Sequence, residues 1–158
     1  MYLPIDRWTI EFRLRYFDRN SWLIHLEDRE LATFDADDIR PSISSDFFIT
    51  AKQQLRLSLQ WVGLKADERQ RYEIPPGDGD LEAIERNDDP ADFAISNMVL
   101  QLRYRWEIAP LSDLFVVYTR GGNLASSVDA DFDRLFTDTF SNPDVDSLIV
   151  KFRYRLGS

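Results

Sequence analysis

Basic side chains at alternating positions are the residues of this chain best suited to act on a ligand. They are Arg13, Arg15, Arg56, Arg103, Arg105, Lys151, Arg153 and Arg155. Successive side chains of a β-strand point to opposite faces, so residues two apart share one face. We therefore expect a basic wall, which would raise the local concentration of anions if it lined a narrow interior.

Other polar residues occupy the same faces and leave a second interpretation open. These residues are Glu11, Gln60, Gln101 and Glu107. In the second interpretation the arginines pair with Glu11, Glu107 and loop carboxylates, and together they fill a closed interior. An open basic interior and a filled one are equally compatible with the pattern.

Other residues that could do chemistry are poorly supported. His25 is the only histidine, and neither a Gly-x-Ser-x-Gly elbow nor a cysteine accompanies it, so we expect a lumenal or core imidazole. Asp129, Asp131 and Asp133 have the spacing of a calcium loop but lack the glycine and the terminal glutamate of an EF-hand. A solvated acidic loop is the preferred interpretation there, and we expect no cofactor and no enzymatic activity.

The elements that carry these residues have a period of two. The last strand, 147–156, is ten residues long, which suits a tilted strand that crosses a membrane. Similar alternation predicts further strands over 8–16, 22–26, 39–49, 55–61 and 93–108, and a sixth that begins at Leu114 and is ended by Gly121-Gly122. Trp22, Ile24 and Leu26 are predicted to continue the apolar face of the first strand after a turn at 18–21, and 131–140 is predicted as a short helix. The predicted fold is one all-β domain over 1–158, an antiparallel up-and-down meander of about seven strands.

Charge is segregated along the chain. Segments 27–38, 65–92 and 121–146 hold 22 of the 28 acidic and 6 of the 19 basic residues, a net charge of −16 that leaves +7 for the rest. The overall charge of −9 argues against nucleic acid as a partner. These acidic segments alternate with short connections at 18–21, 50–53 and 109–112, as the long extracellular loops and short periplasmic turns of an outer-membrane β-barrel do. A soluble antiparallel sheet with one face in its core is the alternative.

Aromatic residues are predicted to form girdles where such a barrel meets the two membrane interfaces. They are Trp8, Tyr16, Trp22, Trp61, Tyr104, Trp106, Tyr118 and Tyr154. The apolar faces are expected to meet lipid, because each Arg or Lys turned to the midplane would cost about 2–4 kcal/mol. The basic faces would then line the interior.

Three segments carry a family resemblance. They are Gln53 to Gly63 (QQLRLSLQWVG), Leu102 to Leu114 (LRYRWEIAPLSDL) and Tyr118 to Gly122 (YTRGG). Together they resemble the C-terminal barrel of a family of bacterial outer-membrane proteins that carry an N-terminal module similar to family-9 carbohydrate-binding domains. The resemblance spans nearly the whole chain and implies a barrel in the outer membrane of a Gram-negative bacterium. It implies no activity, and the 158 residues do not include that module.

The expected role is therefore passage of anionic or carbohydrate solutes, or a membrane platform for an attached module, with the lipid bilayer as partner. A soluble all-β binding domain and a barrel-borne hydrolase that uses loop carboxylates are the alternatives. Seven strands are too few for a bacterial barrel, and an unpaired edge in lipid is costly. We therefore expect an open meander that needs preceding strands or another chain to close it.

Overall fold

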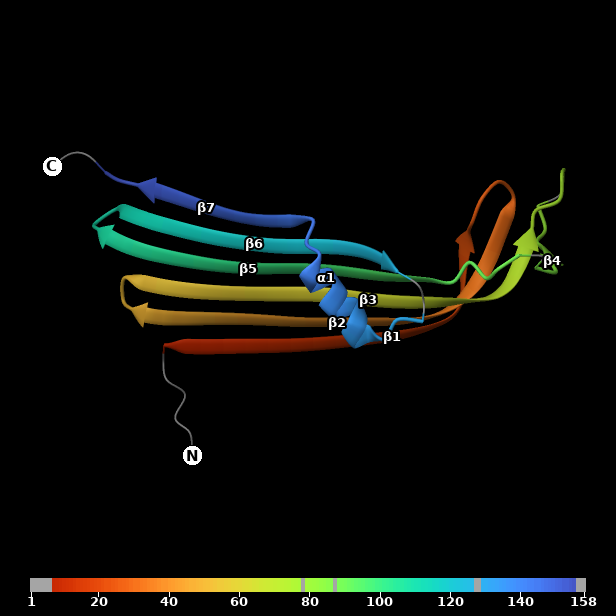
Figure 1. Ribbon diagram of the computed structural model, residues 1–158, viewed down its shortest axis with the longest axis horizontal. Coiled ribbons are helices and arrows are strands. Elements are labelled where there is room, and N and C mark those ends of the chain that lie inside the picture. Colours follow the sequence, from red (N-terminus) through yellow and green to blue (C-terminus); the bar gives the residue numbers. More distant parts are fainter. Residues whose placement is uncertain (1–6, 78, 87, 127–128, 156–158) are drawn as a thin grey trace, which may run out of the picture.

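The protein is a single long antiparallel sheet with one helix lying across it (Figure 1). The computed structural model describes residues 7–77, 79–86, 88–126 and 129–155. The elements are β1 (Trp8–His25), β2 (Glu30–Thr50), β3 (Gln53–Glu73), β4 (Glu82–Ile84), β5 (Phe93–Ala109), β6 (Ser112–Ser126), α1 (Phe132–Ser141) and β7 (Val145–Arg153). The strand order is β1-β2-β3-β5-β6-β7, and the short β4 pairs with β3. The predicted antiparallel meander of seven strands and its short helix are confirmed.

The two ends of the sheet differ. Strands β2 and β3 are joined by the turn 51–52, and β5 and β6 by the turn 110–111; both turns lie at the end where β1 starts and β7 finishes (Figure 1). We call this the turn end. At the opposite end, which we call the distal end, lie the β1–β2 hairpin and β4, whereas β6 and β7 are connected through α1, which lies across the sheet (Figure 1). The short turns predicted near 50–53 and 109–112 are thus confirmed.

The predicted turn at 18–21 is wrong. Strand β1 continues through it with a bulge between Arg19 and Trp22, where Ser21 has a φ of 56°. The Ser21 amide donates a hydrogen bond of 3.0 Å to the Asp35 carboxylate, which holds the bulge against β2. Because a bulge adds one residue to one strand, it moves every later side chain to the other face. Trp22 and Ile24 therefore point to the other face of the sheet from the apolar residues in the first half of β1. The prediction that they continue that apolar face is wrong.

The acidic segments are not the long loops that were predicted. Residues 30–38 belong to β2, 65–73 to β3 and 121–126 to β6. In β2 the acidic residues alternate with buried Ala32, Phe34 and Ala36, so the segment keeps a period of two and remains a strand. The acidic residues therefore decorate the distal ends of long strands as well as the connections between them.

The sheet is open. β1 pairs with β2 and β7 pairs with β6, so the first and last strands form its two edges and do not pair with each other. This confirms the expectation that the described strands do not close a barrel by themselves. Among the described residues, no helix is long and apolar enough to span a membrane. Leu156, predicted to belong to the last strand, lies outside the described residues.

Two small cores are present, both toward the distal end. One, the distal core, is buried between the β1–β3 strands and the segment before β5; it consists of Ala32, Phe34, Ala36, Leu64 and Ala66, with Trp22, Ile24, Leu26, Ala91 and Phe93 against it. The other lies beneath α1 and consists of Trp61, Ala94, Met98, Ala130 and Leu135, with Ile39, Leu59, Phe132 and Phe136 against it. Toward the turn end the sheet has no covering layer of described residues on either face.

Candidate functional site

One face of the sheet carries an apolar band. Its members share a face because the strand register pairs them across the sheet. They are Trp8, Ile10, Phe12, Leu14, Tyr16, Ile39, Ile43, Phe47, Leu55, Leu57, Leu59, Met98, Leu100, Leu102, Tyr104, Trp106, Leu114, Val116, Tyr118, Leu148, Val150 and Phe152. The outer strands are the most open, with Phe12 61%, Val150 62% and Leu148 65% exposed. Contiguous apolar surface on this scale marks an interface with a partner or a membrane.

The apolar band ends at charged residues on the same face. Asp18 follows Tyr16 two positions later in β1, and Arg120 follows Tyr118 in β6. Three further charged residues mark the edge on the neighbouring strands, namely Asp37, Lys65 and Asp146. The band thus has a defined distal edge on β1, β2, β3, β6 and β7.

This distal edge runs obliquely across the sheet. On β1 and β2 it passes through the paired residues Tyr16 and Ile39, whereas on β6 and β7 it passes through the pair Tyr118 and Leu148. Followed from strand to strand through the paired residues, Tyr118 and Leu148 are in register with Ile10 of β1. Ile10 is six residues nearer the turn end than Tyr16, so the edge is displaced by six residues. At about 3.4 Å per residue and about 4.8 Å between strands, the edge crosses the rows at about 40°. Strands of membrane barrels are tilted from the bilayer normal by about 35–45°.

The band's other edge shifts in the same direction. On β1 it begins at Trp8, whereas on β6 and β7 it begins at Leu114 and Phe152, two residues farther toward the turn end, and on β5 Ile108 extends it beyond Trp106. Both edges are therefore displaced toward the turn end as the sheet is crossed from β1 to β7. The displacement is larger at the distal edge, so the band is shorter on β6 and β7 than on β1.

Helix α1 lies on the apolar face next to the distal edge. The Trp61 Nε1 donates to Ser96 Oγ at 2.8 Å, and Ser96 Oγ is 2.6 Å from Thr139 Oγ1 of the helix. The Arg120 guanidinium donates to the Phe140 carbonyl at 2.9 and 2.8 Å, a favourable placement of a cation at the helix C-terminus. Polar groups that would face the apolar band are thus satisfied beneath and beside the helix.

The aromatic residues predicted as girdles divide into three groups. Tyr16 and Tyr118 stand at the distal edge of the band, and Trp8, Tyr104, Trp106 and Tyr154 lie toward its turn end. Trp61 shares this face but is only 5% exposed because α1 covers it. Trp22 lies on the opposite face, against Phe93 of the distal core. Trp61 and Trp22 therefore cannot form part of an exposed girdle.

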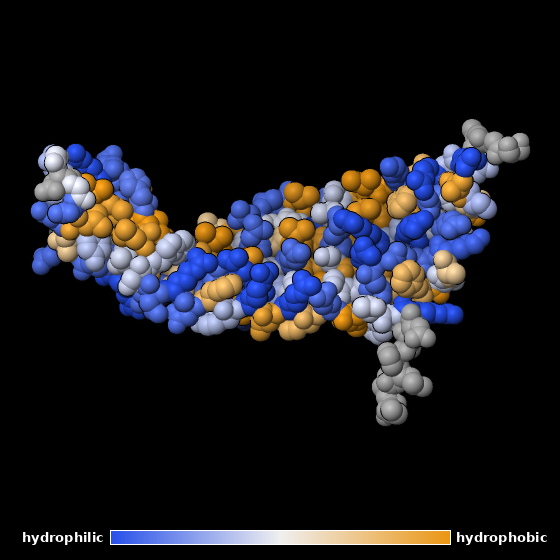
Figure 2. All heavy atoms as spheres, turned by 180° about the vertical axis from the view of Figure 1, so that it is seen from behind, coloured by the Kyte–Doolittle hydropathy of each residue, from blue (hydrophilic) through white to orange (hydrophobic). Residues whose placement is uncertain are grey.

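The opposite face carries the basic wall (Figure 2). The register places every residue predicted for it on this face except Arg155, which follows β7 and whose amide donates to Ser112 Oγ at 3.2 Å. The residues on the face are Glu11, Arg13, Arg15, Arg56, Gln60, Gln101, Arg103, Arg105, Glu107, Lys151 and Arg153. Hydrophilic residues are spread along this face in Figure 2, with apolar ones among them.

Some of these cations are paired and others are not. Arg56 Nε is 2.7 Å from Asp46 Oδ1, and Arg105 Nη2 is 3.0 Å from Asp113 Oδ1. Arg153 also pairs with Asp113, and Arg13 pairs with Glu11. No described carboxylate lies within ion-pair distance of the remaining cations of the wall, Arg15, Arg103 and Lys151.

Asp113 was missed as a partner by sequence reasoning. It sits just after a turn, and only the hairpin 110–111 brings it beside Arg105, eight positions earlier. Asp46 alternates with apolar residues of β2, but its pairing with Arg56 depends on the register of β2 with β3. Strand carboxylates, rather than the predicted loop carboxylates, neutralise the wall, and they do so only in part.

Comparison with known protein families assigns the chain to one of them. Residues 6–157 match the family described as a domain of unknown function, DUF5916. The chain belongs to this family. Among curated proteins and solved structures, none matches it.

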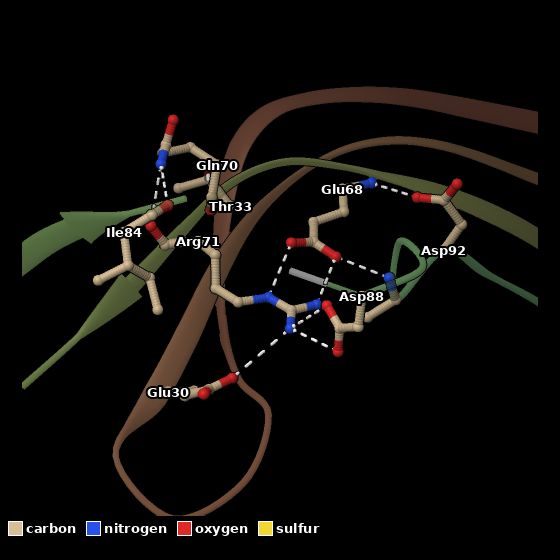
Figure 3. Close-up of polar contacts among 9 residues, drawn as sticks. Glu30, Thr33, Glu68, Gln70, Arg71, Ile84, Asp88 and Asp92 are labelled. Atoms are coloured by element: carbon tan, nitrogen blue, oxygen red, sulfur yellow. Dashed lines mark hydrogen bonds and ion pairs between the residues drawn. The ribbon is translucent and has the colours of Figure 1, made fainter. Parts of the chain in front are cut away.

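The distal end of this DUF5916 chain is held by a charged cluster (Figure 3). Arg71 donates to both oxygens of Glu68 at 3.0 Å and to both oxygens of Asp88 at 2.8 and 3.0 Å. Glu68 also accepts the Ala91 amide at 2.6 Å, and Asp92 accepts the Glu68 amide at 2.6 Å. These contacts clamp the segment before β5 onto β3 above the distal core.

The contacts within the clamp shift the pKa values of Glu68 and Arg71. Burial favours the neutral form of Glu68, but hydrogen bonds from Arg71 and Ala91 outweigh it and hold the pKa of this carboxyl below its usual value. The hydrogen bond to Glu68 likewise raises the pKa of Arg71. Both side chains therefore stay charged in the DUF5916 fold and act as a structural ion pair.

The remaining candidate residues of the sequence are not brought into a site. His25 is exposed at the β1–β2 hairpin, where its Nε2 lies 3.1 Å from the Asp28 carbonyl, rather than in an interior. Asp133 lies in the first turn of α1 and Asp131 is its N-cap residue. In the part of the chain that the structure describes, no three His, Cys, Asp or Glu side chains are grouped to hold a metal, so Asp129, Asp131 and Asp133 do not form such a group.

Proposed function

We propose that this chain forms part of the wall of a β-barrel in a bacterial outer membrane, with the apolar band against lipid and the basic wall toward the interior. The observation that carries the proposal is the oblique apolar band. A water-soluble sheet buries its apolar face beneath a second layer and has no need of an oblique distal edge. Tilted strands that enter a flat apolar layer do need one.

The energetics support the same orientation. Residues Trp8 and Tyr16 at the two edges of the band are eight positions apart, about 27 Å along the strand and about 20 Å along the normal at a tilt of about 40°, close to the roughly 25 Å apolar height of membrane barrels. In the reverse orientation the basic wall would meet lipid at about 2–4 kcal/mol for each Arg or Lys near the midplane.

The proposal requires further strands. The outer edges of β1 and β7 are unpaired among the described residues, and each unsatisfied backbone group in lipid costs several kcal/mol. We propose that strands from a preceding part of a longer chain, or from another chain, pair with these edges. The finished barrel would pass solutes, with anions favoured by the basic wall, or would anchor an attached module such as the carbohydrate-binding-like one of the proteins that the sequence resembles.

The four tryptophans provide the test. Trp8 and Trp106 lie in the apolar band and are 52% and 38% exposed, Trp61 is covered by α1, and Trp22 is on the other face. The full gene product is reconstituted in vesicles that contain a phospholipid brominated near the headgroup, and each Trp is replaced by Phe in turn. Trp8→Phe and Trp106→Phe should each remove part of the fluorescence that bromine quenches. Trp61→Phe and Trp22→Phe should leave the quenched fluorescence unchanged.

Other outcomes decide against the proposal. A chain that stays in solution without detergent and shows no quenching at Trp8 would be a soluble all-β domain, whose apolar band is covered by another protein layer. Equal quenching at Trp22 and Trp106 would place both faces in contact with lipid and would exclude a barrel wall.

A further inference from the structure

The basic wall contains a groove toward the turn end. It spans β3, β5, β6 and β7 and has a volume of about 440 Å³, within the range of small-molecule sites. Four cations line it, Arg56, Arg103, Arg105 and Lys151, and none of the residues that line it is acidic. A groove with this lining favours anions by charge alone.

The cations differ in their availability. Arg56 and Arg105 already bind the carboxylates of Asp46 and Asp113 from outside the groove. Arg103 and Lys151 have no described carboxylate within ion-pair distance. Arg103 lies directly opposite Arg56 in the register of β3 and β5, and because Asp46 already binds Arg56, no described carboxylate compensates the charge of Arg103. An acid group placed between Arg103 and Lys151 would compensate both of these cations.

The floor of the groove is apolar. Phe115 on β6 lies between Arg105 and Lys151 in the register, and the Arg105 guanidinium is 6.0 Å from its ring centroid. Val117 lies next to Ile149 one row away, and Ile149 is 59% exposed. A wall that only had to attract hydrated ions would not need exposed apolar residues beside its free cations, whereas a ligand with an apolar body would use them.

We propose that this groove binds an organic anion: a carboxylate or sulfonate held by Arg103 and Lys151, with an apolar or aromatic body on Phe115, Val117 and Ile149. As the selector for solutes in a barrel interior the groove depends on the function proposed above. As a binding site it does not, because the five residues proposed to hold the ligand lie on one described face of the sheet. Arginine supplies a planar pair of donors that matches a carboxylate, and lysine adds a point charge.

The test uses 4-fluorobenzoate as the probe, followed by fluorine NMR on the full gene product in a neutral detergent. Two comparison ligands separate charge from shape: 4-fluorobenzylamine has the same ring with a positive charge, and acetate has the acid group without the ring. The benzoate should bind at least about tenfold more tightly than either. Arg103→Gln and Lys151→Gln should each weaken benzoate binding about tenfold, the loss expected for one charge-assisted contact. Arg13→Gln changes the same wall outside the groove, where Arg13 pairs with Glu11, and should leave binding unchanged.

The outcomes are distinguishable. Equal affinity for benzoate and acetate overturns the organic-anion proposal, and so does benzoate binding that survives both substitutions in the groove. The ligand comparison on the unaltered protein decides the matter even if a variant fails to fold. Binding as predicted without quenching of Trp8 by brominated lipid supports the site and refutes the barrel. Quenching without binding refutes the site alone.

Discussion

The two halves of β1, β2 and β3 use opposite faces for their apolar residues. In the half near the turn end, the apolar band is exposed and the basic wall lies behind it. In the distal half of β2 and β3 the face of the band carries Asp35, Asp37, Lys65 and Asp67 instead, while Phe34 and Leu64 are buried on the face that was basic. The apolar face of the band therefore ends where these strands become charged on that face, which agrees with the distal edge described above.

The strands reach this inversion by different means. In β1 the bulge between Arg19 and Trp22 moves the apolar residues across, while the residue order alone accomplishes it in β2 and β3. The charges differ as well, since Arg71 of the distal half is buried with Glu68, whereas Arg103 of the basic wall has no described carboxylate partner. The distal half thus has a core and a clamp of its own, and the band half depends on its surroundings.

Removing the clamp should destabilise the distal half and leave the band half unchanged, which is the largest effect we expect. Arg71→Met leaves Glu68 buried without its cation, which costs about 3–5 kcal/mol for a buried pair. Hydrogen exchange should accelerate in 30–36, 64–73 and 91–95, and remain unchanged in 147–153. Arg69→Met is the matched control, because the exposed Arg69–Asp35 pair contributes less than about 1 kcal/mol. Uniform acceleration along the whole chain would show that the two halves do not behave independently.

The band half is tested by placing a charge on each face of β7. Val150 and Ile149 are 62% and 59% exposed, so Val150→Arg and Ile149→Arg would be equally mild in water. In a barrel wall, Val150→Arg should cost about 2–4 kcal/mol of stability in lipid, and Ile149→Arg should cost little because it faces the interior. Urea titration of the protein in vesicles measures both. Equal costs would remove the distinction between the faces.

Two adjacent glycines, Gly121 and Gly122, test how closely α1 packs on the sheet between the two halves. A Cβ on Gly122 would lie 2.7 Å from the Thr139 carbonyl oxygen of α1, whereas one on Gly121 would come no closer than 3.4 Å to the Met98 carbonyl oxygen. Gly122→Ala should therefore push α1 off the sheet and cost about 1–3 kcal/mol. Gly121→Ala should stay within about 0.5 kcal/mol. Proteolysis within 129–144 and the fluorescence of Trp61 report the displacement; equal behaviour of the two variants would contradict this close packing.

Much of the band half could be predicted from the sequence. The alternation in 55–61 and 98–108 determines both faces, because apolar residues alternate there with polar or charged ones, with Val99 as the one exception. The short turns could be predicted from Ala109-Pro110 and its neighbours. The seven strands of the sheet are not the seven that were predicted, since two predicted strands fuse into β1 and the short β4 was not anticipated.

The distal half could not be predicted, and the reasons are local. A turn and a bulge both suit Asp18-Arg19-Asn20-Ser21, and only the pairing of Arg19 with Ala36 and of Trp22 with Phe34 distinguishes them. The clamp depends on Asp88 returning to Arg71 from 17 positions away. Gly121-Gly122 indicated the end of a strand because the close approach of α1, which requires Gly122, is invisible in a local pattern.

The smallest expected effect is a dependence on pH confined to the distal half. Because the folded state lowers the pKa of Glu68 below its usual 4.5, the carboxylate contributes stability above that value and loses it as the pH falls through the lower, folded pKa. Glu68→Gln still accepts hydrogen bonds but does not titrate, so the variant should be less stable at pH 7, and its deficit should shrink below about pH 4.5. Many other carboxylates titrate in this range, but they are common to both proteins and cancel in the difference.

Hydrogen exchange in 64–73, measured at a series of pH values and corrected for the intrinsic rate, gives the difference in stability between the two proteins. A deficit that stays constant from pH 7 to pH 3.5 would mean that folding does not lower the pKa of Glu68, and that the charge of Arg71 adds no stability through this carboxylate.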